Sequence, residues 1–188
     1  MLAVRLTHLS LLLTAALTSA CLSGENSVNA YGGTRSLDSS DWSGVDEPTV
    51  YGADVALKLE LPFTSVEGGW LRSTDDSNSA GGLTDVDITL DEYFVGLRIV
   101  PWKILVEPYA AAGLSLVQGD FDGTNGVTPV GDSDSVLGYY ARVGAALHFA
   151  MLRFGVDARA SFSGDMDLDA IDTDANSYQL AAFIGIGF

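Results

Sequence analysis

The last twelve residues of the chain, 177–188, read SYQLAAFIGIGF. Apolar or aromatic side chains stand at every second position from Tyr178 to Phe188, whereas the other phase consists of Ser177, Gln179, Ala181, Phe183, Gly185 and Gly187. A period of two residues places alternate side chains on opposite faces of a β-strand. The segment therefore predicts a strand with one apolar face and one face of smaller or polar residues.

The same alternation recurs along the chain, and no segment shows the 3.6-residue apolar stripe of an amphipathic helix. Eight segments carry it, at residues 30–37, 51–61, 66–72, 91–100, 104–116, 138–149, 154–162 and 178–188. The chain has 188 residues, a length that suits one domain. We therefore predict a single all-β domain.

The connections between these segments alternate in length. Short turns occupy residues 62–64, 101–103 and 150–152, and long polar connections occupy residues 38–49, 74–86, 118–134 and 164–176. An even number of strands joined in this way predicts an eight-stranded antiparallel up-and-down barrel. Both chain ends then lie at the end of the short turns.

Aromatic residues gather near both ends of the apolar strand face. Ten residues separate Tyr178 from Phe188, which corresponds to roughly 25 Å for strands that rise about 3.3 Å per residue at a tilt of about 40°. A transmembrane β-barrel has an apolar band of that height, so we predict that this face contacts lipid through two aromatic girdles. The girdle residues near the long connections are Tyr51, Trp70, Tyr93, Tyr139, Phe162 and Tyr178, and those near the short turns are Phe63, Phe149, Phe154 and Phe188.

The opposite face of the strands carries charged residues among glycine and alanine. Six are acidic and four are basic: Asp54, Lys58, Glu60, Glu67, Glu92, Arg98, Glu107, Arg142, Asp157 and Arg159. Side chains fill the interior of an eight-stranded barrel, and buried charges must be paired. We predict a structural charge network in the lumen, in which Arg98, Arg142 and Arg159 each bind several carboxylates. The alternative is a narrow ion path through a network that can rearrange.

The segment from Tyr178 to the terminal Phe188 resembles the C-terminal strand of bacterial outer-membrane barrels, and residues 28–188 as a whole resemble the OmpA/OmpX-type eight-stranded barrels. The resemblance implies a transmembrane barrel in the bacterial outer membrane, with short periplasmic turns, long acidic extracellular loops and both termini in the periplasm. It also implies contact with outer-membrane lipid and lipopolysaccharide. In that family the barrel-assembly machinery reads the C-terminal strand.

The N-terminus predicts export. Arg5 precedes an apolar stretch at residues 9–18, which is too short to cross a bilayer as a helix, and small residues lead to Cys21. The segment LTSAC at residues 17–21 resembles a bacterial lipobox, which implies acylation of Cys21; the alternative is an ordinary signal-peptidase site. We divide the chain into a signal peptide (1–20), a lipid-anchor tether (21–27) and the outer-membrane barrel (28–188). Cys21 is the only cysteine, so no disulfide forms within the chain.

The chain has 25 acidic and 9 basic residues and a net charge of −16 at pH 7, yet its mean hydropathy is +0.24. The acidic balance argues against nucleic acid as a partner. Sixteen of the acids lie in the four long connections, where no Lys or Arg occurs, which predicts solvated, self-repelling loops. The alternative is divalent-cation binding, alone or with lipopolysaccharide, at Asp165, Asp167, Asp169, Asp172 and Asp174, although the glycine and the glutamate of an EF-hand loop are missing.

Residues suited to catalysis are scarce. His148 is the one histidine after the signal peptide, and no serine neighbours it in sequence as part of a nucleophile–base pair. We therefore predict no enzymatic activity and no cofactor. The expected role is structural or surface interaction, such as envelope integrity or adhesion; the alternatives are a low-conductance channel for ions or small solutes and, more remotely, a lipid A-modifying enzyme. Arg72, just beyond Trp70 on the apolar face, is either an exposed rim arginine or a contact for a lipopolysaccharide phosphate.

Overall fold

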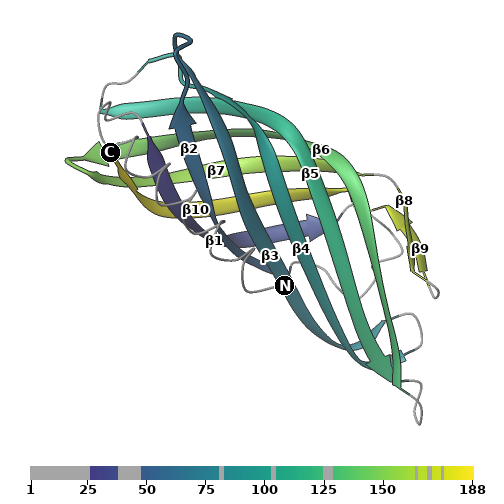
Figure 1. Ribbon diagram of the computed structural model, residues 1–188. Helices are drawn as coiled ribbons and strands as arrows, with labels where there is room; N and C mark the ends of the chain where they lie inside the picture. The colour runs from purple at the N-terminus through teal and green to yellow at the C-terminus, as the bar shows by residue number, and fades with distance from the viewer. Residues whose placement is uncertain are drawn as a thin grey trace, which may run out of the picture.

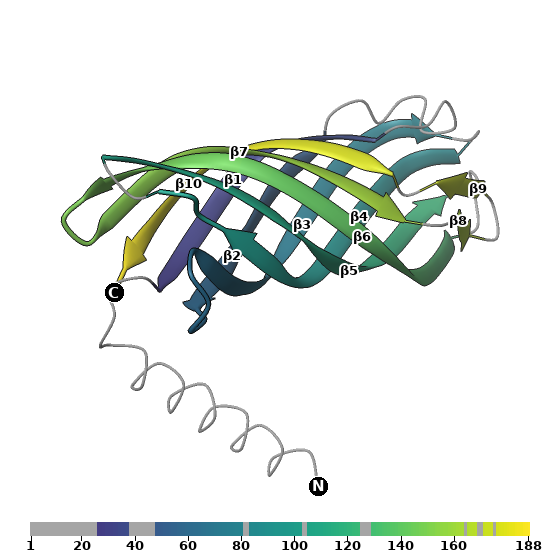
Figure 2. The same ribbon diagram turned by 90° about the horizontal axis from the view of Figure 1, so that it is seen from above.

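In the computed structural model, eight strands close into a barrel, and a two-stranded hairpin lies at one end of it (Figures 1 and 2). The structure describes residues 26–37, 48–80, 83–102, 105–124, 129–163, 165–168, 171–174 and 176–188. For Leu37 and for residues 75–88, 121–132 and 164–175 the description extends to the backbone at most. No helix in the described part of the chain is long and apolar enough to cross a membrane.

The predicted eight-stranded antiparallel up-and-down barrel is confirmed. The barrel strands are β1 (Ser27–Leu37), β2 (Thr49–Lys58), β3 (Thr64–Ala80), β4 (Leu83–Ile99), β5 (Val106–Thr124), β6 (Pro129–Phe149), β7 (Leu152–Ser163) and β10 (Ser177–Gly187), and the separate hairpin consists of β8 (Asp165–Leu168) and β9 (Ile171–Asp174). Around the barrel the order is β1-β10-β7-β6-β5-β4-β3-β2, with every neighbouring pair antiparallel. Each barrel strand therefore has a partner on both sides wherever the barrel is closed.

The alternation of the C-terminal segment is visible in the exposure of β10. Tyr178 and Leu180 are exposed on the outer face, whereas Gln179 and Phe183 are buried on the inner face. The strand pairs with β1 over its whole length, from Ser177 opposite Leu37 to Gly187 opposite Ser27. The C-terminal strand thus closes the barrel.

The short turns and the C-terminus meet at one end of the barrel (Figure 2). The backbone N–H of Gly187 donates a hydrogen bond of 2.8 Å to the carbonyl of Met151, and that of Asn26 donates one of 3.0 Å to the carbonyl of Phe188. Phe63 (φ 59°) and Ala150 (φ 56°) adopt the left-handed conformation in two of the turns. That conformation costs an L-residue roughly 1–2 kcal/mol, and the paired strands on either side hold it in place.

Strand pairing continues where the sequence predicts open connections. β3 and β4 remain paired out to Ala80 and Leu83, and β5 and β6 remain paired out to Thr124 and Pro129. In contrast, β2 begins only opposite Thr74 of β3, so these strands run on past β2 as a sheet extension, which is visible at the lower right of Figure 1. Residues 75–79 are all polar, and Phe121 is the one large apolar residue in 118–124, so neither segment carries an apolar period that would reveal a strand.

The last long connection, residues 164–176, contains the β8–β9 hairpin, which lies at the opposite end of the barrel from the short turns (Figure 2). Its register places Asp165 opposite Asp174 and Asp167 opposite Asp172. The first long connection, residues 38–49, falls almost wholly outside the described residues.

Candidate functional site

The barrel interior is the most densely charged part of the described structure. Ten charged side chains from the inner strand faces are at most 3% exposed: Arg35, Arg98, Arg142, Arg153 and Arg159, with Asp54, Glu67, Glu92, Glu107 and Asp157. Five positive and five negative charges leave this described set formally neutral. Buried charges are tolerated when they are paired and hydrogen-bonded, and the interior meets that condition.

The centre of the interior is organised around two arginines that share Asp54. Its Oδ2 atom lies 2.8 Å from Nη2 of Arg98 and 2.9 Å from Nη1 of Arg142. Arg98 Nε donates to Glu67 Oε2 at 2.6 Å, and Arg142 Nε donates to Asp157. Five side chains from five different strands are therefore joined in one hydrogen-bonded cluster.

Three tyrosines complete this central cluster. The hydroxyl of Tyr31 donates to Asp54 at 2.6 Å, that of Tyr109 to Asp157 at 2.9 Å, and that of Tyr140 to Glu67 at 2.7 Å. The rings also lie against arginines, with the guanidinium carbon of Arg98 4.7 Å from the Tyr109 ring centroid and that of Arg142 4.7 Å from the Tyr31 centroid. Each tyrosine therefore packs its ring in the lumen and donates a hydrogen bond to a buried carboxylate.

Glycines opposite these rings make room for them. A Cβ atom at Gly96 would lie 2.3 Å from the Tyr140 hydroxyl oxygen, and one at Gly144 would lie 2.5 Å from the Tyr109 hydroxyl oxygen. Such contacts are too short for any side chain. The glycines on the inner face are therefore needed because tyrosine rings from the adjacent strand, or from the strand after it, lie over them.

A second cluster surrounds Glu92, nearer the long-connection end. Arg35 of β1 and Arg159 of β7 both donate to its carboxylate, and Ser161 Oγ lies 3.2 Å from Oε1. Leu71 and Val117 lie directly beside Glu92 on the two neighbouring strands and are 2–3% exposed. Water therefore has little access to this part of the lumen.

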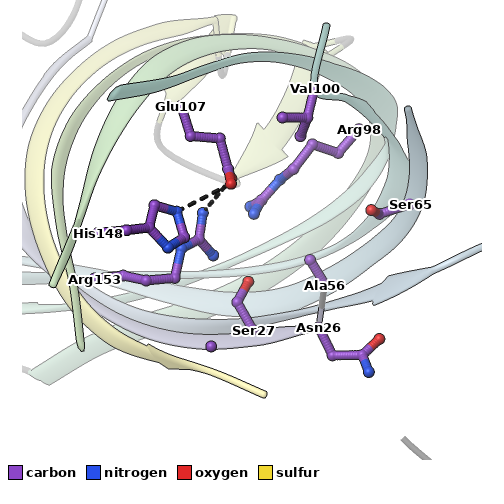
Figure 3. Close-up of a pocket in the computed structure, with 10 residues that line it drawn as sticks. Asn26, Ser27, Ala56, Ser65, Arg98, Val100, Glu107, His148 and Arg153 are labelled. Atoms are coloured by element: carbon purple, nitrogen blue, oxygen red, sulfur yellow. Dashed lines mark hydrogen bonds and ion pairs between the residues drawn. The ribbon is translucent and has the colours of Figure 1, made fainter. Parts of the chain in front are cut away.

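The third cluster lies at the short-turn end, around Glu107 (Figure 3). Arg153 Nη2 lies 2.7 Å from its Oε1 atom, and His148 Nε2 lies 3.0 Å from its Oε2 atom. Figure 3 shows both side chains reaching Glu107 from one side of the lumen. The hollow that they line measures about 10 Å³, about the minimum that holds a single water molecule. It has no room for a substrate.

The structure brings together eight of the ten charged residues that the sequence assigns to the lumen. Lys58 is half-buried at the last position of β2, and Glu60 is exposed in the turn that follows, so the inner face of the strand ends before Glu60. Sequence reasoning missed Arg35 and Arg153. Arg153 has the same strand phase as Asp157 and Arg159, and extending that strand by two residues to Leu152 would have revealed it.

The outer face of the barrel is apolar and carries the predicted girdle residues. Tyr51, Tyr93, Tyr139, Phe162 and Tyr178 near the long connections are exposed, as are Phe63, Phe149 and Phe154 near the short turns, while Trp70 and Phe188 are half-exposed. Tyr93 lies directly opposite Trp70, and Phe162 lies opposite Tyr139. The turns add Leu61, Trp102, Leu105 and Met151, each more than half exposed, which the sequence analysis left out.

Two predicted sites fall outside the described side chains. Asp165, Asp167, Asp172 and Asp174 are placed by backbone only, and Asp169 and Cys21 are outside the described residues. Among the side chains that the structure describes, no group of three or more His, Cys, Asp or Glu residues is placed to hold a metal ion. Cation binding at the aspartates and acylation of Cys21 stay predictions.

No protein-family model matches the chain, and no curated protein sequence is detectably similar to it. Solved structures of similar shape include Neisserial surface protein A, with a TM-score of 0.57 and 13% identity over 88% of this chain and 98% of that one. The N-terminal β-barrel domain of Pseudomonas aeruginosa OprF gives a TM-score of 0.53 and 11% identity, over 87% of this chain and 98% of that one.

The attachment invasion locus protein Ail of Yersinia pestis has a TM-score of 0.51 and 14% identity, over 87% of this chain and 96% of that one; it has also been solved with the heparin analogue sucrose octasulfate. At these identities the likeness is one of fold. Strand number, closure and antiparallel order all agree with it. The chain has the fold of the eight-stranded bacterial outer-membrane β-barrels.

Proposed function

We propose that the protein resides in the bacterial outer membrane as a non-conducting barrel with a structural or surface-interaction role. The observation that carries this proposal is the filled lumen, in which ten charged side chains are paired and at most 3% exposed. A role in solute passage needs a continuous aqueous path, whereas envelope integrity or adhesion needs a stable barrel that presents its outer end.

Three charged clusters occupy the lumen at successive levels. The Glu92, Asp54 and Glu107 clusters follow one another from the long connections to the short turns, and the hollow at the last of them is about 10 Å³. An ion could pass only if buried pairs such as Arg142–Asp157 separated, and breaking a buried pair costs about 3–5 kcal/mol. The low-conductance channel therefore stands as the second candidate.

The outer surface supports placement in a lipid bilayer. Leu97, Val143 and Ile184, from three different strands, are each more than half exposed although they are large and apolar. Exposing such side chains to water is costly, at about 25 cal/mol for each Å². A surrounding bilayer removes that cost, and the exposed tyrosines and phenylalanines near both ends fit the two interfaces.

The first and last described residues, Asn26 and Phe188, lie on the side of the short turns, which we assign to the periplasm. The chain enters β1 at Ser27, next to the C-terminal residue. The six residues from Cys21 to Asn26 span at most roughly 20 Å when extended. That length suits an acyl anchor on Cys21 in the periplasmic leaflet, with residues 21–27 as its tether.

The opposite end carries the features of an interaction surface. The β3–β4 and β5–β6 hairpins run on beyond β2 and β7, and the four long connections hold sixteen acids and no Lys or Arg. An anionic ligand would be repelled by this charge. We therefore propose a partner with a basic surface, or one bridged by divalent cations.

Planar-bilayer recording separates the two leading candidates. The wild-type barrel, folded into a bilayer, is expected to give no conductance steps, and an Arg98→Ala/Arg142→Ala variant that stays folded is expected to leak. Regular steps from the wild-type protein would favour the channel.

Mass spectra of lipid A from cells with and without the gene test the remote enzymatic alternative, for which we expect identical spectra.

A hairpin deletion tests the surface role. Thr74 lies directly opposite Thr89, so an Asn-Gly turn in place of residues 75–88 closes the hairpin without changing the barrel register. We expect this variant to fold normally and to lose adhesion to a basic surface such as a polylysine coat or a cell matrix. A second test variant replaces residues 119–134 between Gln118 and Ser135, which are also directly opposed. Wild-type adhesion and wild-type detergent resistance in both variants would contradict a role of the hairpins.

A further inference from the structure

The outer face of the barrel carries one basic side chain in the described structure. Arg35, Arg98, Arg142, Arg153 and Arg159 are buried in the interior, and Lys58 lies at the short-turn end. Arg72 instead lies on the outward face of β3, in line with Trp70 and toward the long connections. A basic side chain on an otherwise apolar and acidic surface indicates a specific interaction at this position.

Arg72 is held in place by a carboxylate on the next strand. Asp91 lies directly opposite Arg72 in the register of β3 and β4. Arg72 Nε lies 2.8 Å from Asp91 Oδ1, and Nη2 lies 2.6 Å from Oδ2, which is a two-pronged contact. Trp70 Nε1 donates to the same Oδ1 atom at 2.8 Å. The Asp91 side chain is 10% exposed and the Arg72 side chain 39% exposed, so the carboxylate is covered and the guanidinium is accessible.

Aromatic rings surround this pair. The guanidinium carbon of Arg72 lies 5.5 Å from the ring centroid of Trp70, and Trp70 meets Tyr51 edge to face at 6.0 Å. Tyr51 is directly opposite Arg72 on β2, and Tyr93 is directly opposite Trp70 on β4. Tryptophan and tyrosine side chains favour the headgroup level of a bilayer. The Arg72 guanidinium therefore lies at the depth where lipid headgroups begin.

The hydrogen-bond capacity of Arg72 exceeds what Asp91 uses. A guanidinium has five N–H groups in a fixed fork. Asp91 takes one from Nε and one from Nη2, and the Tyr51 hydroxyl on β2 is a further hydrogen-bond partner, which leaves two N–H groups for another acceptor. The fork of an arginine fits the paired oxygens of a phosphate. Asp91 and Trp70 fix the guanidinium so that its remaining edge is available to such a group.

We propose that Arg72, positioned by Asp91 and Trp70, binds the phosphate of a lipid headgroup in the leaflet at the long-connection end. This rests on the proposed membrane location. A lipid phosphate is favoured over a free one because Asp91 already neutralises Arg72, so the site needs a ligand that the bilayer concentrates. The acidic connections also repel free anions from this end of the barrel.

Native mass spectrometry of the detergent-purified, folded barrel tests the site. The probes are bis-phosphorylated lipid A, the same lipid after removal of its phosphates, and inorganic phosphate. We expect the wild-type barrel to retain the phosphorylated lipid roughly tenfold better than the dephosphorylated one, the size expected for a hydrogen bond to a charged group. Arg72→Gln is expected to abolish that preference, and Arg72→Lys to keep only part of it, because an ammonium lacks the fork.

Lys58→Gln is the matched control, since it removes one positive charge at the short-turn end, and it is expected to retain the lipid as the wild type does. Equal retention of both lipids by the wild type, or an unchanged preference in Arg72→Gln, overturns the site. Displacement of the lipid by equimolar inorganic phosphate overturns the assignment to a lipid. Flotation of the protein with vesicles reports membrane insertion separately, so failure of the membrane location is distinguishable from failure of the Arg72 site.

Discussion

Arg142 on β6 and Asp54 on β2 lie 88 positions apart in the chain and meet across the barrel interior, with Arg142 Nη1 2.9 Å from Asp54 Oδ2. The same carboxylate oxygen accepts a hydrogen bond from Arg98 on β4 at 2.8 Å. β2, β4 and β6 are not neighbours in the barrel, so one carboxylate links three walls that the strand hydrogen bonds do not join directly.

Replacing Arg142 should destabilise the barrel strongly. Arg142→Gln leaves Asp54 and Asp157 buried with fewer cationic partners, and breaking a buried pair in this way costs about 3–5 kcal/mol. We expect a lower urea midpoint and a lower temperature at which the folded band is lost in heat-modifiability gels. Arg72→Gln, which breaks a pair whose arginine is 39% exposed, is the comparison and should lower the midpoint much less. An Arg142→Gln midpoint equal to that of the wild type would contradict the pairing model.

The contact between Gly144 and Tyr109 should tolerate no added side chain. A Cβ at Gly144 would lie 2.5 Å from the Tyr109 ring and 2.8 Å from the Cβ of Asp157. Overpacking of this kind costs about 1–3 kcal/mol, so Gly144→Ala should lower the unfolding midpoint. At Gly32 a Cβ would meet nothing within 4 Å, and Gly32→Ala should leave the midpoint unchanged. Similar midpoints for the two variants would show that the lumen is loosely filled.

The short turns should be immersed in the bilayer. Trp102, Leu61 and Met151 are each more than half exposed at that end of the barrel. A variant with Trp42→Phe and Trp70→Phe keeps Trp102 as its only tryptophan. In vesicles of brominated lipid we expect its fluorescence to be quenched by bromines on the upper acyl chain and protected from aqueous acrylamide. Full acrylamide access would place the turns in water instead.

Acylation of Cys21 should be readable from the mature N-terminus. The lipobox resemblance predicts a diacylglyceryl group on this residue after removal of residues 1–20. Mass spectrometry of protein from a bacterial host should show the added lipid mass on the wild type and none on Cys21→Ser. The barrel of Cys21→Ser should still fold, because β1 begins six residues later, at Ser27. An unmodified Cys21 thiol in the mature wild-type protein would favour ordinary signal-peptidase cleavage.

The fold follows from the sequence wherever one strand face is apolar. The period of two is clear in β6, where one strand face is buried in the lumen and the other is exposed and apolar. The exposed face carries Tyr139, Val143 and Leu147, and the buried face carries Tyr140 and Arg142. Residues 75–80 of β3, in the sheet extension, lacked that signal. Asp75, Asp76 and Ser77 pair with residues of β4 through backbone hydrogen bonds, which do not depend on side-chain polarity.

The sequence predicts which residues line the interior, but it does not predict which of them form ion pairs. Alternation places Arg142 and Asp157 on the inner face of adjacent strands, but the contact of Arg142 with Asp54 depends on the curvature of the closed barrel. Arg35 was missed because small residues leave the phase of β1 ambiguous in the sequence. The Arg72–Asp91 pair could not be predicted from the sequence either, because only the register of β3 and β4 brings the two residues together.

The pairing of β1 with β10 also determines when the barrel can close during folding. Ser27 and Gly187, opposite each other at the seam, are separated by 160 positions, which is nearly the whole chain. Contacts between residues so distant in sequence form slowly, because the loop between them must close first. The nascent chain must therefore stay unfolded and protected from aggregation until its last strand arrives. Truncation of β10 would remove the seam itself and leave two unpaired edges open to other chains.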